Sequence, residues 1–356
     1  MKKIAILLPT IHAGGAEKQA CLLAKCLSTN SFDVTFIPYY GLADAEPKNE
    51  RILASVSAVK VIVPKGGRFG RMFALKRILQ DGQFDVLFNY LTFCDVVGGM
   101  IAKWSGVKTV FGGIRNARLP WTKMMAERLA HNYISDYTIY NNYSGAEYFG
   151  GHGFNPSKNI VIHNCFENIS TYYQHPSTDC PKIISVGRFV EQKDYLTALK
   201  SIKQLKEQHI RFKYVIVGYG VLEKQIREWV ASFGLEDEVD IKIAPKNIPE
   251  LLLESDIYLS TSLFEGTSNS LLEALNASLP VVATNVGDNS YIVIEGKNGT
   301  LHSIGDYKQI ADSLQKLITD SSIRKRFGIA GHQNLVDNFS EEKFTNRYVE
   351  LINSQI

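Results

Sequence analysis

The sequence predicts an α/β protein built from two doubly wound domains, and three observations carry this prediction. The chain of 356 residues is long for one domain and suits two. Unalternated apolar runs, typical of strands buried on both faces of a parallel sheet, alternate with amphipathic helical stretches. The alternation restarts with a fresh apolar run in the middle of the chain. We therefore expect a first domain over residues 1–165, a linker over 166–180, a second domain over 181–339 and a separate C-terminal helix over 340–356.

The composition fits a folded protein with an uneven distribution of charge. Hydrophobic residues make up 45% of the chain and charged residues 21%, so it can bury complete cores and is not expected to be disordered. The net charge is +3, but residues 1–180 contain 19 lysines and arginines against 13 acidic residues, whereas residues 181–356 contain 20 against 23. The basic first half predicts an anionic surface or substrate on that side.

The cysteines indicate a reducing compartment. They are scattered and odd in number, and none forms a Cys-x-x-Cys pair, so neither a disulfide framework nor a metal site is expected from Cys21, Cys26, Cys94, Cys165 and Cys180. The first apolar run is too short for a secretory signal, and no run approaches the length that crosses a bilayer. We expect a soluble, cytoplasmic protein that is at most attached to a membrane surface.

The first domain is expected to gather polar residues at one edge of its sheet. Strands are predicted at residues 4–8, 33–37, 59–63, 85–90 and 108–111, with helices at 69–79 and 95–104, and residues 161–165 close this half of the chain. Ligands of doubly wound sheets bind beyond the carboxyl ends of the strands. The polar residues that end or follow these strands are His12, Asn89, Tyr90, Arg115 and Asn116. Each alone also fits an ordinary loop, but together they predict a binding edge.

Two glycines separate the first strand from the helix that continues through Leu27. Gly14 and Gly15 allow the backbone to approach a ligand closely at the start of this helix. The pattern is not G-x-G-x-x-G, which disfavours a dinucleotide site. A plain strand–helix turn remains the alternative.

The second domain begins with a strand at 182–186, followed by Gly187 and two cations. Arg188 and Lys193 lie between this strand and the helix expected from Tyr195, where they can clamp a diphosphate. A solvated pair of loop residues is the alternative. The next strand, 212–217, ends in Gly218-Tyr219-Gly220, which resembles a dinucleotide fingerprint but has Glu223 in place of the third glycine.

The stretch from Ser260 to Thr284 carries the strongest pattern of the chain. A predicted strand leads into a loop with Glu265, and then into a helix with Glu273. Between them stand three residues of types that favour helix N-caps, Thr267, Ser268 and Asn269. The start of this helix can direct backbone N–H groups toward an anion, and the two carboxylates can accept hydrogen bonds from sugar hydroxyls. The pattern indicates a ligand with phosphate and hydroxyl groups, although a βαβ unit with a solvent-facing glutamate also fits.

Several other kinds of site are not indicated. The chain contains no Asp-x-Asp, no cluster of histidine, cysteine and carboxylate at metal-ligand spacing, and no Gly-x-Ser-x-Gly elbow. We therefore expect no cofactor and no required divalent metal.

With these motifs in hand, the chain resembles the retaining glycosyltransferases of family 4, which have the GT-B fold of two Rossmann-like domains facing across a cleft. The likeness covers nearly the whole chain, and its most specific part is a Glu-x7-Glu motif at Glu265 and Glu273. The other matching stretches are Val186–Arg188 with Lys193, Val217–Gly220, Gly14–Lys18 and Val161–Asn164.

The resemblance implies a role for each matching residue. Arg188 and Lys193 would neutralise the donor diphosphate, Glu273 would bind ribose hydroxyls, and Glu265 would bind hydroxyls of the transferred sugar. The backbone positions implied in donor binding are Gly14, Gly15, Gly187, Gly218, Thr267, Ser268 and Asn269, with the base near Ala244 and Pro245. The C-terminal helix would cross back to the N-terminal domain.

The implied chemistry is front-face attack with retained configuration, in which cations and amides stabilise the leaving diphosphate. Glu265 would position the sugar and would not act as one of the paired carboxylates of a glycosidase. The chain departs from the family at Asp288–Tyr291, where a glutamate is frequent. It also departs at Gly112–Asn116, where many members carry a histidine; here Arg115 is expected to act on the acceptor or the sugar instead.

The expected function is transfer of a hexose or N-acetylhexosamine from a nucleotide sugar to a glycan or lipid-linked acceptor in cell-surface polysaccharide synthesis. A UDP-sugar is favoured and GDP-mannose is the second choice; nucleic acid is not expected as a partner. Two alternatives are a nucleotide-sugar epimerase of the same fold and a non-catalytic subunit that binds nucleotide sugars. Turnover without an acceptor would indicate the first, and binding without turnover the second.

An anionic membrane surface is a further expected partner. Residues 68–79 contain four basic residues among six large apolar ones, with Lys65 before them. A second basic and aromatic group consists of Arg115, Arg118, Trp121 and Lys123. We expect most of the apolar side chains of 68–79 to pack on the sheet while the basic ones face outward toward anionic lipid.

Overall fold

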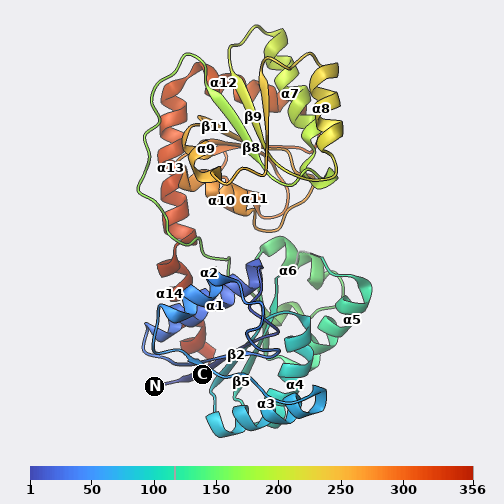
Figure 1. The fold of residues 1–356 in the computed structure, drawn as a ribbon, viewed down its shortest axis with the longest axis vertical. Coiled ribbons are helices and arrows are strands. Elements are labelled where there is room, and N and C mark those ends of the chain that lie inside the picture. The colour runs from blue at the N-terminus through green and yellow to red at the C-terminus, as the bar shows by residue number, and fades with distance from the viewer. Residues whose placement is uncertain (116–117, 356) are drawn as a thin grey trace. The chain divides into compact units, whose positions relative to one another are not determined.

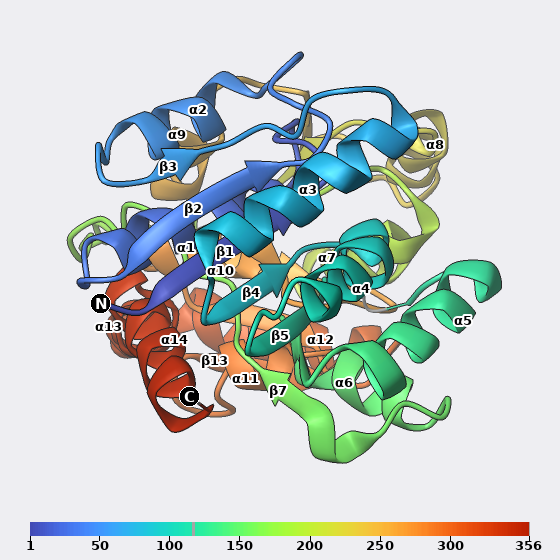
Figure 2. The same ribbon diagram turned by 90° about the horizontal axis from the view of Figure 1, so that it is seen from below.

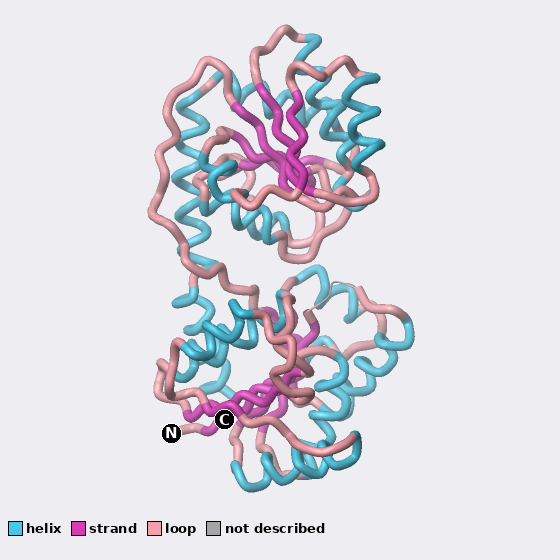
Figure 3. The backbone as a smooth tube through the Cα atoms, in the orientation of Figure 1, coloured by secondary structure: helices cyan, strands magenta, loops and turns pink. Residues whose placement is uncertain are grey.

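The computed structural model describes residues 1–115 and 118–355, which form two compact units (Figure 1). Unit 1 consists of Met1–Cys165 together with Glu341–Ile356, and unit 2 consists of Phe166–Ser340. Each unit is a parallel sheet with helices on both faces, which Figure 3 shows as strands between layers of helix. The predicted α/β class, with two doubly wound domains, is confirmed.

Within the described residues, unit 1 contains a seven-stranded parallel sheet of order β3-β2-β1-β4-β5-β6-β7. The reversal of strand order lies between β1 and β4, which pair through Ile4–Leu7 and Val86–Asn89. The strands are β1 (Lys3–Leu8), β2 (Asp33–Pro38), β3 (Lys60–Val61), β4 (Val86–Asn89), β5 (Thr109–Ile114), β6 (Tyr137–Tyr140) and β7 (Asn159–Val161).

Alternate residues of β1 explain why both faces of this sheet are covered. Ile4, Ile6 and Leu8 belong to one core cluster and Ala5 and Leu7 to another, and all five are fully buried. The first cluster lies under α1 (Gly15–Ser28), α2 (Pro47–Ala54) and α14 (Glu341–Gln355). The second cluster lies under α3 (Arg68–Gly82), the π-helix η1 (Cys94–Gly98) and α4 (Gly99–Trp104). The same face of the sheet is also covered by α5 (Trp121–Leu129) and the π-helix η2 (Ala130–Ile134) (Figure 2). Near β7 lie α6 (Tyr143–Gly150) and the short helix η3 (Pro156–Lys158).

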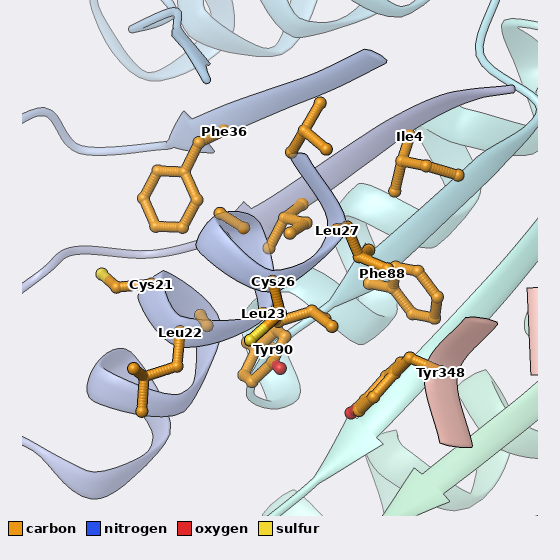
Figure 4. Close-up of a cluster of buried hydrophobic side chains, with 14 of the residues drawn as sticks. Ile4, Cys21, Leu22, Leu23, Cys26, Leu27, Phe36, Phe88, Tyr90 and Tyr348 are labelled. Carbon is orange, nitrogen blue, oxygen red and sulfur yellow. The ribbon is translucent and has the colours of Figure 1, made fainter. Parts of the chain in front are cut away.

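Helix α14 belongs to unit 1 although it follows all of unit 2 in the sequence. Tyr348 is fully buried and makes an edge-on contact with Phe88, with ring centroids 5.4 Å apart (Figure 4). At the start of the helix, Lys25 Nζ lies 2.8 Å from Glu341 Oε2. The side chains that α14 contributes to the core are Phe344, Tyr348, Leu351 and Ile352.

Unit 2 contains a six-stranded parallel sheet of order β10-β9-β8-β11-β12-β13 in the part that the structure describes. Its strands are β8 (Lys182–Val186), β9 (Lys213–Gly218), β10 (Val239–Ile243), β11 (Ile257–Ser260), β12 (Val281–Thr284) and β13 (Gly299–His302). One core cluster packs α7 (Tyr195–Glu207), α8 (Glu223–Ser232) and α12 (Tyr307–Thr319) on the sheet. The other packs α9 (Ile248–Leu253), α10 (Asn269–Asn276), α11 (Asn289–Ile292) and α13 (Ser321–Phe339).

The stretch expected to be a linker, 166–180, is extended backbone held against unit 2. The backbone N–H of Ser170 donates to Asn276 Oδ1 at 2.9 Å, and that of Tyr173 donates to Ser278 Oγ at 3.0 Å. These bonds attach the stretch to the end of α10 and the turn that follows it. The structure therefore groups these residues with unit 2.

Some element boundaries differ from the sequence prediction. Strand β5 runs on to Ile114 and includes Gly112 and Gly113, which were expected in a loop. Glycine is needed within this strand because the backbone passes so close to β4 that a Cβ on Gly113 would overlap the carbonyl oxygen of Asn89. Strand β7 ends at Val161, at the start of the stretch expected to close the first half of the chain. Strands β6 and β13 were not predicted from the sequence. None of the helices in the described ranges has the length and apolarity needed to cross a membrane.

Candidate active site

The centre of the candidate site in unit 2 is an ion pair between Lys193 and Glu265. Lys193 Nζ lies 2.6 Å from Glu265 Oε1, and the two side chains are only 17% and 10% exposed. Ser262 Oγ donates to the same oxygen at 2.8 Å. Both hydrogen bonds that the described residues make to this carboxylate thus end on Oε1, and Oε2 stays available as an acceptor. The sequence proposed these two residues for one site, and the structure brings them together.

The two loops that hold the pair are fastened to each other along their length. Gln192 Nε2 donates to the carbonyl oxygen of Phe264 at 2.7 Å, and the backbone N–H of Leu263 donates to the carbonyl oxygen of Gln192 at 2.8 Å. Thr261 Oγ1 donates to the carbonyl oxygen of Lys193 at 3.0 Å. These bonds preset the separation of the cation and the carboxylate before any ligand arrives.

The pair lies where the strand order of unit 2 reverses. Lys193 follows β8 and Glu265 follows β11, and these strands are neighbours at the centre of the sheet. From β8 the chain moves outward to β9 and β10, whereas from β11 it moves to β12 and β13 on the other side. Loops at such a reversal diverge and leave a crevice beyond the carboxyl ends of the strands, where ligands of open α/β sheets bind.

Three glycines let the surrounding loops approach closely. A Cβ on Gly218 would overlap the carbonyl oxygen of Gly187, and a Cβ on Gly287 would overlap that of Glu265. Gly287 also has a φ of 54°, a conformation that glycine adopts at little cost. Gly187 itself lies against the side chains of Lys193 and Tyr195, whose hydroxyl donates to its carbonyl oxygen at 3.0 Å. Side chains at these positions would push the loops of the candidate site apart.

Helix α10 begins directly after the Glu265 loop. Ser268 is its N-cap residue, and the Ser268 side chain does not cap the first turn. The first N–H groups of a helix have no intrahelical acceptor, and they lie at the positive end of the helix dipole. Thr267, Ser268 and Asn269 thus occupy the turn that was predicted to face an anion. Glu273 is half-buried on the next turn, close enough to Tyr258 to help raise the pKa of its buried phenol, after the larger effect of burial.

The remaining residues predicted for donor binding lie at the same edge of the unit 2 sheet. Arg188 is exposed directly after β8. Ala244 and Pro245 follow β10, and the backbone N–H of Ala244 donates to the carbonyl oxygen of Gly218 at 3.0 Å. Ala244 is exposed and has a φ of 42°. The carboxyl edge of this sheet therefore holds the cations, both glutamates and the predicted base position.

In unit 1, Gly14 and Gly15 stand at the start of α1. Gly14 is its N-cap, with extended backbone at φ −169°, and no atom lies within 4 Å of the position that a Cβ on Gly15 would take. Both glycines are exposed. His12 is exposed in the preceding loop, where its Nε2 lies 3.2 Å from the carbonyl oxygen of Ala43. All three lie at the carboxyl edge of the unit 1 sheet.

Asn89 and Arg115 lie at the same edge, but both are largely covered. Asn89 is 1% exposed, and neither its amide nitrogen nor its amide oxygen has a partner among the described residues. Arg115 lies over the ring of Tyr90, 4.4 Å from its centroid, and donates to Tyr348 Oη at 3.3 Å. Its Nε and Nη1 atoms are buried without a described partner. Asn116, the last of the predicted acceptor-side residues, lies outside the described residues.

The structure also contains a buried carboxyl pair that the sequence did not predict. Asp95 is 1% exposed, Glu127 is 3% exposed, and their side chains share a hydrogen bond. Asp95 Oδ1 accepts from the backbone N–H of Gly113 at 2.9 Å, which ties the pair to the end of β5. Burial raises the pKa of Asp95 to about 7, and it raises the pKa of Glu127 well above its usual value. Two carboxyl groups that share a hydrogen bond need a proton between them.

Sequence reasoning also missed the residues that position the central ion pair. Gln192, Thr261 and Ser262 are polar loop residues without a motif of their own. The one available signal is that Thr261 and Ser262 directly follow a strand whose loop carries Glu265. Asp288, in the stretch that departs from the family pattern, is fully buried, and so is Asn289, which donates to the carbonyl oxygen of Thr284 at 2.9 Å.

The comparisons with known proteins point in one direction. The model of the family described as "Glycosyl transferases group 1" matches residues 173–334, which include most of unit 2. The lipopolysaccharide core biosynthesis glycosyltransferase LpsE of Rhizobium meliloti is 27% identical over 177 residues, covering 50% of this chain and 51% of that protein. The amylovoran biosynthesis glycosyltransferase AmsD of Erwinia amylovora is 24% identical over 99% of this chain and 100% of that protein. Apart from such full-length matches, the chain spans about half the length of the curated relatives it resembles.

Solved structures match the whole chain. The crystal structure of HepE from Anabaena in complex with UDP has a TM-score of 0.78 at 19% identity and covers 99% of this chain and 100% of its own. The lipopolysaccharide outer core galactosyltransferase WaaB, in its apo form, gives a TM-score of 0.78 at 17% identity with the same coverage. At these identities the likeness establishes the fold, which is GT-B.

Proposed function

We propose that the protein is a glycosyltransferase that takes a sugar from a nucleoside-diphosphate sugar. The observation that carries this proposal is the Lys193–Glu265 pair at the strand-order reversal of unit 2. A cation suits a phosphate, and a carboxylate with a free oxygen suits a sugar hydroxyl. The family match over residues 173–334 supports the same assignment.

The cations of unit 2 act on the departing group. When the bond between the sugar C1 and the phosphate oxygen breaks, the electron pair leaves with the nucleoside diphosphate and the sugar becomes oxocarbenium-like. Lys193 and Arg188 stabilise the negative charge that grows on the diphosphate, together with the first amides of α10. The acceptor hydroxyl forms the new bond to C1, and its proton passes to the leaving phosphate.

Glu265 positions the sugar in this reaction. Its Oε1 is engaged by Lys193 and Ser262, and its Oε2 accepts from a hydroxyl of the transferred sugar. Held on two sides by neighbours in its own unit, the carboxylate is preorganised for a hydrogen bond that strengthens as the sugar gains positive charge. We propose that the reaction proceeds by front-face attack with retention, without a covalent glycosyl–enzyme intermediate.

The nucleotide would lie along the same edge of the sheet. Glu273 accepts from the ribose hydroxyls, and the base lies against the backbone at Ala244 and Pro245. Gly187 and Gly218 let the loops after β8 and β9 approach each other closely at this edge, and we propose that their backbone contacts the diphosphate. For Gly14 and Gly15 of unit 1, a role in donor binding stays a proposal from the sequence. UDP is the favoured nucleotide, since HepE was crystallised with UDP and with UDP-glucose.

The acceptor is assigned to the carboxyl edge of unit 1, near His12, Asn89 and Arg115. We propose a glycan or lipid-linked acceptor in the synthesis of a cell-surface polysaccharide or lipopolysaccharide, with the reaction on the cytoplasmic side. The names of LpsE, AmsD and WaaB support this class of acceptor.

The experiment that tests the proposed function has two stages. Thermal-shift measurements with UDP, GDP and their sugars will reveal which nucleotide stabilises the folded protein. Turnover is then measured with and without acceptor glycans, and with a chelator. We expect a UDP-sugar to raise the melting temperature, acceptor-dependent release of UDP, and full activity in the chelator.

The alternatives give different results in the same experiment. Conversion of one nucleotide sugar into another without an acceptor would make the protein an epimerase. Binding of a nucleotide sugar without any turnover would make it a binding subunit. Loss of activity in the chelator, with rescue by magnesium or manganese, would contradict the metal-independent mechanism.

A further inference from the structure

Helix α3 carries two phenylalanines that the described part of the protein leaves exposed. Phe69 is 73% exposed and Phe73 is 74% exposed. The two residues are four positions apart, so they lie on the same side of neighbouring turns. Leu75 and Leu79 on the opposite side are fully buried against the sheet of unit 1. The helix is thus anchored through one face and presents an aromatic pair on the other.

Basic residues surround this aromatic pair. Lys65 and Arg68 are exposed immediately before and at the start of α3. Helical spacing places Lys76 and Arg77 on the same side of α3 as the phenylalanines, one turn after Phe73; Arg77 is exposed and Lys76 is half-buried. Of these four, Arg77 alone has a carboxylate partner among the described residues, Asp81 at 3.6 Å, and that pair is largely exposed. The positive charge around the phenylalanines is therefore mostly uncompensated.

A third exposed aromatic residue lies at the same edge of unit 1. Trp121 is the first residue of α5 and is 71% exposed, and Lys123 beside it is exposed as well. In a parallel sheet each connecting helix begins at the carboxyl edge, so α3 and α5 both start there. Figure 2 shows the two helices on the same side of the unit 1 sheet. The predicted acceptor residues Asn89 and Arg115 end or follow strands at this edge.

We propose that this aromatic–basic surface binds a lipid bilayer with anionic headgroups. It consists of Phe69, Phe73 and Trp121 with Lys65, Arg68, Lys76, Arg77 and Lys123. Aromatic side chains that insert at the interface, combined with cations facing anionic headgroups, are the combination that holds a protein on such a membrane. The basic character of the first half of the chain favours this partner over a neutral one. The inference extends the proposed function, because it brings the acceptor edge to a membrane that carries lipid-linked acceptors.

The test is co-sedimentation of the full chain with vesicles, without donor or acceptor. One set of vesicles contains phosphatidylcholine alone, and the other contains phosphatidylglycerol as well. We expect binding to the anionic vesicles only, weakening as salt rises. The variant Phe69→Ala/Phe73→Ala should lose roughly tenfold in binding, and each of Lys65→Glu and Arg68→Glu at least about fivefold.

The chain offers a matched control in Trp104. It is 68% exposed, but it is the last residue of α4 and thus lies at the opposite, amino edge of the sheet. Trp104→Ala should bind the anionic vesicles like the unsubstituted protein. Since all these side chains are exposed, the variants should melt at the same temperature, and a lower melting temperature would identify a variant to be replaced by Phe69→Ser or Phe73→Ser.

Several results would overturn the proposal. These are equal binding to both kinds of vesicle, no binding at low salt, and an equal loss in Trp104→Ala. A change of oligomeric state in the phenylalanine variant, seen by analytical ultracentrifugation, would assign the surface to a second copy of the chain. Nucleotide binding is measured on the same samples. If the protein binds nucleotide but not anionic vesicles, the membrane proposal fails while the proposed function stands.

Discussion

The ammonium group of Lys193 lies 2.6 Å from Oε1 of Glu265, and both side chains are mostly buried. Each charge compensates the other while no donor is present. The ammonium group of Lys193 would also donate a hydrogen bond to a bound donor diphosphate, so that the cation bridges the carboxylate and the phosphate. Removal of one partner leaves a largely buried charge without its counterpart, which costs more than the pair contributes when intact.

The two glutamates should have separable effects on catalysis. We expect Glu265→Ala to lower kcat, because its hydrogen bond to the sugar strengthens in the transition state, and Glu273→Ala to raise KM for the donor, because ribose is bound equally throughout the reaction. Steady-state kinetics with varied donor concentration measures both effects. If both variants changed KM alone, the two assignments would be wrong.

The two cations should each stabilise the transition state. Arg188→Ala and Lys193→Ala should each lose on the order of 2–4 kcal/mol, as expected for removal of one preorganised donor. The measurement is kcat/KM for the donor, and Lys224→Ala, whose side chain is 91% exposed on α8, is the control. A loss no larger than in that control would remove Arg188 or Lys193 from the mechanism.

Gly218→Ala should loosen the donor site. The added Cβ would overlap the carbonyl oxygen of Gly187 and force β9 and the loop after β8 apart. Overpacking of this kind costs roughly 1–3 kcal/mol, so we expect a lower free energy of unfolding in urea and weaker binding of UDP. Gly70→Ala on α3 is the matched control, because Gly70 has no proposed role in donor binding and no atom lies near its added Cβ. Unchanged stability of Gly218→Ala would mean that the two loops can separate freely.

The Asp95–Glu127 pair should make stability depend on pH. Burial raises the pKa of Asp95 from 3.8 to about 7, so between these values the folded protein keeps a proton that the unfolded chain has released. The unfolded state then binds fewer protons, and the free energy of unfolding falls as pH rises through this range. Glu127, with its pKa also raised, contributes with the same sign.

We expect Glu127→Gln to flatten this dependence, since the amide leaves one titrating group where there were two. Urea unfolding at pH 5 and pH 7.5 measures the effect, and Glu50→Gln on the exposed side of α2 is the control. The shared proton would be contradicted if the free energy of unfolding changed with pH equally in Glu127→Gln and in the unsubstituted protein. It would also be contradicted if the free energy of unfolding of the unsubstituted protein rose with pH over this range.

Much of the fold could be predicted because apolar runs report burial directly. The strand at the start of each unit is buried on both faces and therefore lacks alternation, as β1 shows with five consecutive fully buried residues. Strand β6 was not predicted although its residue types favour strands, because it is only four residues long and is defined by its pairing with β5 and β7. Glycines in β5 look like a loop until the close backbone of Asn89 is known.

The sequence predicted those site residues whose charge suits direct contact with a ligand. It did not predict the residues that only hold another side chain of the site in place. Glu265 and Lys193 are charged residues in the connections that follow strands β11 and β8, so their position indicated a ligand. Ser262 and Gln192 act only through the pair, and nothing in their sequence context distinguishes them from loop residues. The sharing of a proton by Asp95 and Glu127 depends on two helical segments that are separate in the sequence and adjacent in space.

The position of α14 has a consequence for biosynthesis. Phe344, Tyr348, Leu351 and Ile352 complete the core of unit 1, yet they emerge from the ribosome only after all of unit 2. Domains generally fold in the order in which they are synthesised. Here unit 1 cannot complete its core until α14 has been made, and until then Phe88 and Tyr90 are exposed to solvent. Unit 2 does not depend on α14 for its core. A released chain that is truncated after residue 340 should therefore contain a protease-resistant unit 2 and a protease-sensitive unit 1. Chaperones that recognise exposed apolar surface would therefore have access to the incomplete unit 1 for longer than to unit 2.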